Sequence, residues 1–102
     1  MQLFENVGLI EPLQRALVQA NYKEMTPIQA EAIPPLLQGK DIVGCAQTGT
    51  GKTAAFLLPI IQMLMAVERP ERWGIRALIL SPTRELAAQC HSMLSGLSAH
   101  LD

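Results

Sequence analysis

The chain has 102 residues, of which 49% are hydrophobic and 17% charged, a balance typical of one small globular domain and not of a disordered protein. Its net charge of −1 excludes an overall basic surface for nucleic acids, so any such contact must be local. The longest apolar stretch, residues 54–67, contains Pro59 and Gln62 and is too short to cross a bilayer. We therefore expect no membrane partner and a cytoplasmic location.

The first 39 residues have the pattern of two helices. The first is amphipathic, because these residues recur at helical spacing: Leu13, Ala16, Leu17 and Ala20. The second is predicted to begin after Thr26, a capping residue type, with Pro27 at the first helical position, and to run toward Gly39. We expect residues 34–35, both proline, to distort or end it.

Residues 40–102 have a different pattern, in which short apolar runs alternate with helical segments. Residues 41–46 and 75–80 are apolar without alternation, as in parallel strands covered on both faces. Between them, residues 54–66 predict a buried helix with an irregularity at Pro59. A last helix has one apolar face, made of Leu86, Ala87, Cys90, Met93, Leu94 and Leu97. This order predicts a layered α/β domain with parallel strands, preceded by the N-terminal helical segment 1–39.

The turn between the first strand and its helix has the spacing of a P-loop. Residues 46–53 read AQTGTGKT, with alanine where the common pattern has its first glycine. Gly49 and Gly51 allow backbone N–H groups to converge on phosphate oxygens. Lys52 can reach the β and γ phosphates, and the hydroxyl of Thr53 suits Mg²⁺. The alternative is a flexible turn with a surface lysine.

Three motifs in this order resemble those of the DEAD-box RNA helicases. Residues 21–29 are similar to the adenine-reading Q motif of that family, and Phe4 matches the isolated aromatic residue upstream of that motif. Residues 46–53 are similar to the family's motif I. Residues 82–87, PTRELA, are similar to its motif Ia. Met25 departs from the family's usual proline and Asn21 from its frequent glycine. The resemblance implies part of a RecA-like, three-layer P-loop domain, incomplete over residues 40–102.

The resemblance also implies an ATP site with Mg²⁺. Its residues would be Phe4, Tyr22, Thr26, Gln29, Thr48, Gly49, Thr50, Gly51, Lys52 and Thr53. A glutamine amide has a donor and an acceptor, which suits the N6 and N7 edge of adenine, so Gln29 would select ATP over GTP. Tyr22 would face the base, with Phe4 supporting the pocket from outside. For Tyr22 and Phe4 the alternative is ordinary core packing.

Motif Ia implies contact with an RNA backbone. Pro82 and Thr83 form a turn that leads into a helix, and Arg84 follows, so N–H groups, a hydroxyl and a guanidinium can meet phosphates without reading the base sequence. The alternative is that Thr83 only caps the helix and that Arg84 lies in a solvated first turn.

The implied parent activity is ATP-dependent remodelling or unwinding of RNA duplexes. Hydrolysis needs carboxylates for Mg²⁺ and for the attacking water, and the acidic residues after Thr53, namely Glu68, Glu71, Glu85 and Asp102, do not follow an apolar strand. We therefore expect this chain alone to be inactive or nearly so, and its exposed strand edges to favour self-association. The alternatives are a non-catalytic adenine-nucleotide or RNA-binding module and another P-loop enzyme, such as a small-molecule kinase.

Overall fold

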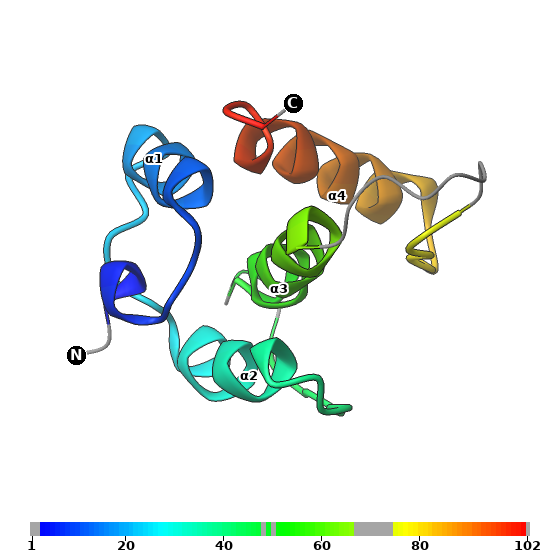
Figure 1. Cartoon of the computed structure of the whole chain (residues 1–102). Helices are drawn as coiled ribbons and strands as arrows, with labels where there is room; N and C mark the ends of the chain where they lie inside the picture. The colour runs from blue at the N-terminus through cyan, green and yellow to red at the C-terminus, as the bar shows by residue number, and fades with distance from the viewer. Residues whose placement is uncertain (1–2, 48, 50, 67–74, 102) are drawn as a thin grey trace.

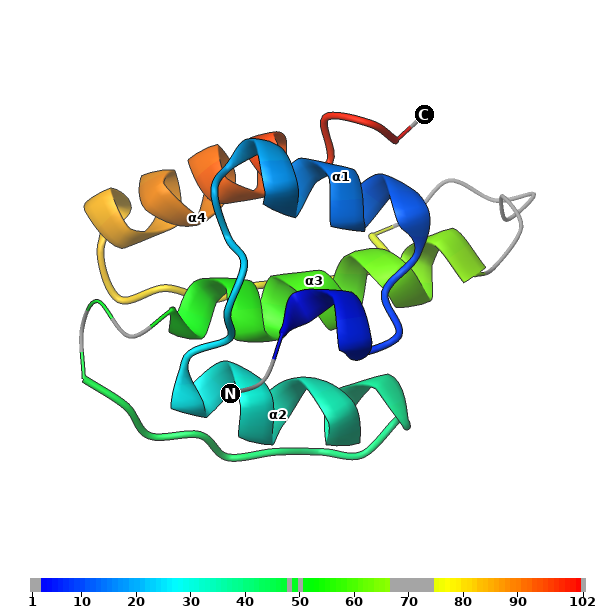
Figure 2. The same ribbon diagram turned by 90° about the vertical axis from the view of Figure 1, so that its left-hand side faces the viewer.

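The computed structural model describes residues 3–47, 49, 51–66 and 75–101. Its elements are η1 (Phe4–Asn6), a 3₁₀ helix, and the α-helices α1 (Glu11–Gln19), α2 (Pro27–Leu37), α3 (Lys52–Ala66) and α4 (Arg84–Leu97). Helix α3 lies in the middle, with α2 on one side and α1 and α4 on the other (Figures 1 and 2). No described helix is long and apolar enough to cross a membrane.

The first predicted helix is confirmed as α1. Leu13, Ala16 and Leu17 are its buried residues, as their spacing predicts. Ala20 lies just after the helix as its C-cap and is exposed, so its predicted place on the buried face is wrong. The helix ends there because the chain turns at Asn21, which has a left-handed φ of 62°.

The second predicted helix is confirmed as α2, but its prolines do not end it. Thr26 caps the helix, because its hydroxyl accepts from the Gln29 N–H while the Gln29 side chain accepts from the Thr26 N–H. Residues 34–35 lie inside the helix, which continues to Leu37. The chain leaves the helix at Gly39, where φ is 84° and where Gly39 and Lys40 donate to carbonyls of the last turn, as in a Schellman motif.

Helix α3 carries the centre of the core. Leu57 and Leu58 are fully buried, and Pro59 is buried inside the helix. Each fully buried leucine contributes about 1.5–3 kcal/mol relative to an exposed one. The opposite side of the helix is more open, since Met63 is 51% exposed. The prediction of a buried helix is therefore right for one face.

The two strands predicted over residues 41–46 and 75–80 are not found. Among the described residues, β-pairing is confined to one isolated antiparallel bridge between Leu3 and Glu24. A strand needs a hydrogen-bonded neighbour, and its apolar side chains need a layer that covers them. Val43 is 98% exposed and Ile75 is 85% exposed, so neither segment has such a layer. The expected three-layer arrangement with parallel strands is thus absent from the described part of the chain, where the layers are helical.

Helix α4 covers α3 mainly through its second half. Leu97 is buried, and Cys90, Met93 and Leu94 are half-buried against the core. Leu86, near the start of the helix, is 42% exposed. The apolar face predicted from the sequence therefore exists, but its first turn lies away from the core.

Candidate nucleotide site

The candidate phosphate loop ends where α3 begins. Gly49 and Gly51 have φ values of 85° and 83°, a left-handed backbone that glycine adopts without strain. Lys52 is the first residue of α3 and is exposed, so its ammonium group is open to solvent. The predicted phosphate contacts Thr48 and Thr50 lie outside the described residues. Two left-handed glycines just before a helix N-terminus are the backbone features expected where N–H groups face an anion such as a nucleotide phosphate.

A buried side chain of α2 ties the loop to that helix. The Nε2 of Gln29 donates to the carbonyl oxygen of Gly51 at 3.1 Å, across 22 positions of sequence. The same carbonyl accepts from the N–H of Ala55, the first turn of α3, at 3.2 Å. Gln29 is only 3% exposed, and its Oε1 accepts from the Thr26 N–H at 2.9 Å. One buried amide therefore joins the cap of α2 to the phosphate loop.

This connection requires glycine at position 51. A Cβ there would overlap with Nε2 of Gln29 and would lie 3.3 Å from the Thr26 hydroxyl oxygen. Gly49 differs, because a Cβ there would meet no heavy atom within 4 Å. The two glycines therefore have different roles: Gly49 supplies only a backbone conformation, and Gly51 also allows the close approach of Gln29.

Gln29 keeps hydrogen-bonding capacity for a ligand. Its Nε2 has a second hydrogen, and its Oε1 has a second lone pair, besides the two bonds to Gly51 and Thr26. One donor and one acceptor are what an adenine edge needs. The bonds to Thr26 and Gly51 therefore leave one donor and one acceptor on an amide that is only 3% exposed.

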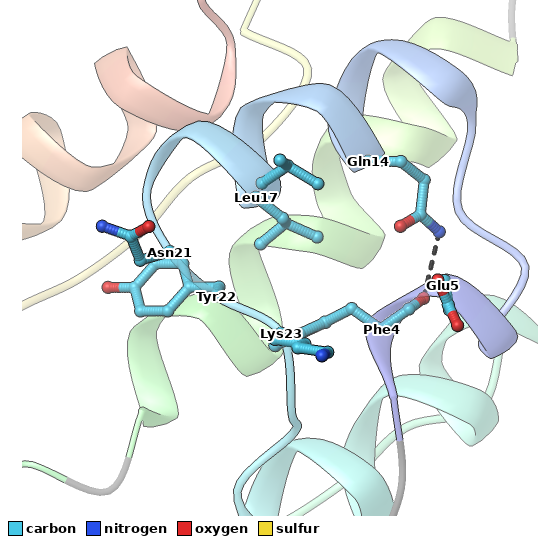
Figure 3. A pocket seen from close by; sticks show the side chains of 8 residues that line it. Phe4, Glu5, Gln14, Leu17, Asn21, Tyr22 and Lys23 are labelled. Atoms are coloured by element: carbon cyan, nitrogen blue, oxygen red, sulfur yellow. Dashed lines mark hydrogen bonds between the residues drawn. The ribbon is translucent and has the colours of Figure 1, made fainter.

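The predicted aromatic residues lie together, on a cavity whose lining does not include Gln29. The rings of Phe4 and Tyr22 are 6.4 Å apart and tilted by 50°. Phe4 is buried at 2% exposure, whereas Tyr22 is 38% exposed. Both line a cavity of about 400 Å³ between η1, α1 and the loop after α1, with Gln14 and Leu17 on its wall (Figure 3).

A second cavity reaches the phosphate loop. It has a volume of about 340 Å³ and lies between α2, residues 42–44 and the start of α3. Lys52 lines it together with apolar residues such as Ile28 and Phe56. Thr53, the predicted Mg²⁺ ligand, follows Lys52 and is half-buried. The structure thus brings Thr26, Gln29 and Gly51 into contact, but places the aromatic pair and Lys52 on different cavities.

The predicted RNA-binding segment forms the start of α4. The hydroxyl of Thr83 accepts from the Leu86 N–H at 3.1 Å, so Thr83 caps the helix. Pro82 and Arg84 are exposed on either side of it. Capping leaves the Thr83 hydroxyl hydrogen and the Arg84 guanidinium as donors on the surface.

Comparison with known proteins identifies the family. The model of the DEAD/DEAH box helicases matches residues 26–102, which is most of the chain. The chain belongs to the DEAD/DEAH box helicase family. The family resemblance read from the three motifs is therefore confirmed.

The relatives in this family are much longer than the chain. It is 48% identical over 97 residues to the ATP-dependent RNA helicase HAS1 of Scheffersomyces stipitis, which covers 95% of the chain and 17% of that protein. It is 50% identical over 95 residues to the probable ATP-dependent RNA helicase ddx27 of Dictyostelium discoideum, covering 93% of the chain and 12% of that protein. The chain thus spans less than a fifth of either relative.

Solved structures of the family share this fold. The chain matches the RNA helicase Prp28 from Chaetomium thermophilum, solved with ADP, with a TM-score of 0.89 and 44% identity, over 99% of the chain and 25% of that structure. It also matches a DEAD box protein from Methanococcus jannaschii with a TM-score of 0.81 and 36% identity, over 95% of the chain and 26% of that structure. The neighbours are RecA-like helicase domains, so the coarse fold prediction is confirmed.

Three features of the site were not predicted. The turn at Asn21 keeps a left-handed backbone, which asparagine tolerates better than most residues, so this departure from the family's glycine preserves the turn. Met25, in place of the usual proline, packs against the core. The Gln29 bond to Gly51 was also missed, because a polar contact between distant segments has no pattern in the sequence.

Proposed function

We propose that this chain is the ATP-binding part of an ATP-dependent RNA helicase. Residues 46–53 would hold the triphosphate, with Lys52 at the β and γ phosphates, and Gln29 would select the base. The observation that carries this proposal is the hydrogen bond from buried Gln29 to Gly51, because it couples the segment that resembles the adenine-reading motif to the phosphate loop. ADP in the similar Prp28 structure supports a nucleotide ligand.

The local chemistry fits magnesium as the companion of the triphosphate. Thr53 offers a neutral hydroxyl oxygen at the start of α3, and Mg²⁺ prefers oxygen ligands while keeping several waters. The described residues contain no group of three or more His, Cys, Asp or Glu side chains that could hold a metal ion by themselves. We therefore propose that Mg²⁺ binds here together with ATP, with Thr53 as its protein ligand.

We also propose that binding is accompanied by little or no hydrolysis in this chain alone. When bound, Mg²⁺ would stabilise charge on the phosphates, but the attacking water still needs a carboxylate to orient it. Of the acidic residues after Thr53, only Glu85 lies in the described part of the chain, exposed in the first turn of α4. Unwinding of RNA duplexes is thus proposed for the whole helicase.

Contact with RNA is proposed at Pro82, Thr83 and Arg84. The exposed Arg84 and the open N-terminus of α4 suit phosphate oxygens, which are bound without reading the bases.

Segments 41–46 and 75–80 stay our candidates for parallel strands of a RecA-like sheet, supported by the match to Prp28 over nearly the whole chain. The division of the chain into an N-terminal helical segment, 1–39, and an incomplete P-loop domain, 40–102, stays a prediction, as does the cytoplasmic location.

Equilibrium binding with the Lys52→Ala variant tests the proposal. Lys52 is exposed, so its removal is expected to change stability by less than about 0.5 kcal/mol. Binding of Mg-ATP should fall by at least about tenfold, since a charge-assisted contact to phosphate contributes about 1.5–3 kcal/mol. Lys40→Ala, another exposed lysine that is not in the loop, is the matched control. Equal Mg-ATP affinity in the two variants would contradict the proposal.

A further inference from the structure

Gln62 fastens a segment that precedes it by more than fifty positions. It lies in the third turn of α3, and its Oε1 accepts from the Ile10 N–H at 2.8 Å. Its Nε2 donates to the carbonyl oxygen of Gly8 at 3.0 Å. Both polar atoms of one amide thus bind backbone groups of two residues, Gly8 and Ile10, in the connection between η1 and α1. None of the motifs in the sequence accounts for this glutamine.

The segment it holds also packs through its apolar side chains, since Leu9 is buried in the core and Val7 and Ile10 lie against it. Gly8 has a φ of 91°, so the chain reverses here through a conformation that favours glycine. Ile10 is the N-cap of α1 and has no side-chain capping bond of its own. Gln62 provides the acceptor for the Ile10 N–H, so α3 anchors the entry into α1.

The other end of the same segment is held beside Tyr22. The Phe4 N–H donates to the Lys23 carbonyl at 3.1 Å, next to the Leu3–Glu24 bridge. The Nε2 of Gln14 donates to the Phe4 carbonyl at 3.0 Å, as the dashed line in Figure 3 marks. The segment from Leu3 to Ile10 is therefore attached at its start to the loop that carries Tyr22. At its end it is attached to α3 through Gln62.

We propose that Gln62 is a positioning residue for the base site. It fixes the segment from Phe4 to Ile10 on α3, the helix whose first residue is Lys52, and so sets the distance between the aromatic pair and the phosphate loop. Gln62 itself touches no ligand. The proposal rests on the proposed function, since it concerns the purine half of the same nucleotide site.

The two halves of the nucleotide make the role testable. Gln62→Leu removes both hydrogen bonds while keeping a side chain of similar size. We expect Mg-ATP affinity to fall by about tenfold, the scale of one or two net hydrogen bonds. Affinity for magnesium tripolyphosphate, which has no base, should stay within about twofold of the unaltered chain. A general loss of folding would instead weaken both ligands.

Hydrogen exchange supplies a second readout that needs no nucleotide. The Ile10 amide should exchange faster in Gln62→Leu, because its acceptor is removed. Gln62→Glu keeps an acceptor for Ile10 but turns an oxygen toward the Gly8 carbonyl in place of the donor, so a loss of ATP affinity is expected here as well. It also serves as the second variant if Gln62→Leu does not fold by circular dichroism. Met63→Leu, at the exposed neighbouring position, is the matched control and should behave as the unaltered chain.

The outcomes separate this inference from the function on which it rests. Weaker ATP binding with unchanged tripolyphosphate binding and faster Ile10 exchange would support it. ATP affinity that stays unchanged in Gln62→Leu, or that falls together with tripolyphosphate affinity, would overturn this inference alone. Failure of the unaltered chain to bind either ligand would overturn the proposed function, and this inference with it.

Discussion

Replacing Gly51 by alanine tests the contact between the phosphate loop and Gln29. The new Cβ would overlap with Nε2 of Gln29, and the backbone φ of 83° would be strained in any residue with a side chain. Gly49→Ala has almost the same φ, 85°, but its Cβ would enter open space. The pair therefore separates backbone strain from loss of the Gln29 contact.

The expected magnitudes follow from these two terms. A left-handed backbone costs a residue with a Cβ roughly 1–2 kcal/mol, and this alone applies to Gly49→Ala. Displacing Gln29 leaves a buried amide without its partner, which costs about 1–3 kcal/mol more. We expect Gly51→Ala to lower the free energy of unfolding by roughly 2–5 kcal/mol in total.

Urea unfolding followed by helical circular dichroism measures this difference, and calorimetry of Mg-ATP binding measures its effect on the site. A double variant, Gly51→Ala with Gln29→Ala, provides the cycle, since the collision is absent once the long side chain is removed. In that background the cost of Gly51→Ala should fall to that of Gly49→Ala. Equal costs for Gly49→Ala and Gly51→Ala in the unaltered background would refute the reasoning.

Three further predictions concern the rest of the chain. Thr83→Ala removes the cap of α4 and should lower the free energy of unfolding by about 1 kcal/mol, measured in urea; Thr83→Ser should restore it, and no loss in Thr83→Ala would contradict the cap. Val43→Ser should change this free energy by less than about 0.5 kcal/mol because Val43 is 98% exposed, and a loss above about 2 kcal/mol would indicate a covered strand. Leu80→Lys, at 85% exposure, should reduce self-association in sedimentation experiments, whereas Glu85→Lys should not; equal association in both variants would contradict a role for residues 75–80.

The helices could be predicted from the sequence because their signals are local. Thr26 and Pro27 mark the start of α2, and the spacing of Leu13 and Leu17 marks the buried face of α1. The predicted run of α2 toward Gly39 is confirmed, because the helix stops just before Gly39 adopts a left-handed backbone, whereas the prolines at 34–35 do not end it. Local signals therefore predict where these two helices lie, and proline alone does not predict where α2 ends.

The strands could not be predicted reliably, because strand formation depends on neighbours that are not local in sequence. Residues 41–46 and 75–80 have strand-like composition, yet side chains such as Val43 and Leu80 are exposed. In the first half of α4, Leu86 is likewise exposed, because burial of a helix face also depends on segments that are distant in sequence. The composition of a segment shows that it can form a strand, and hydrogen-bonded pairing with a neighbouring strand determines whether it does.

The residues of the candidate site come from the sequence motifs, whereas the bonds that connect them come from the fold. The glycines and Lys52 follow from spacing alone, since a phosphate loop is a local structure. The bonds of Gln29 to Gly51 and of Gln62 to Gly8 join segments 22 and 54 positions apart, so only the fold reveals them. They add the positioning of the loop and of the aromatic segment to what the motifs predict.

Calorimetric titration of the chain with Mg-ATP and with Mg-GTP tests the central claim most directly. If the phosphate loop holds the triphosphate and Gln29 selects the base, Mg-ATP binds at least about tenfold more tightly, as expected for a base recognised by a paired donor and acceptor worth about 1–3 kcal/mol. Gln29→Ala should remove most of this preference. Equal affinity for the two nucleotides, or no binding of either, would contradict the account.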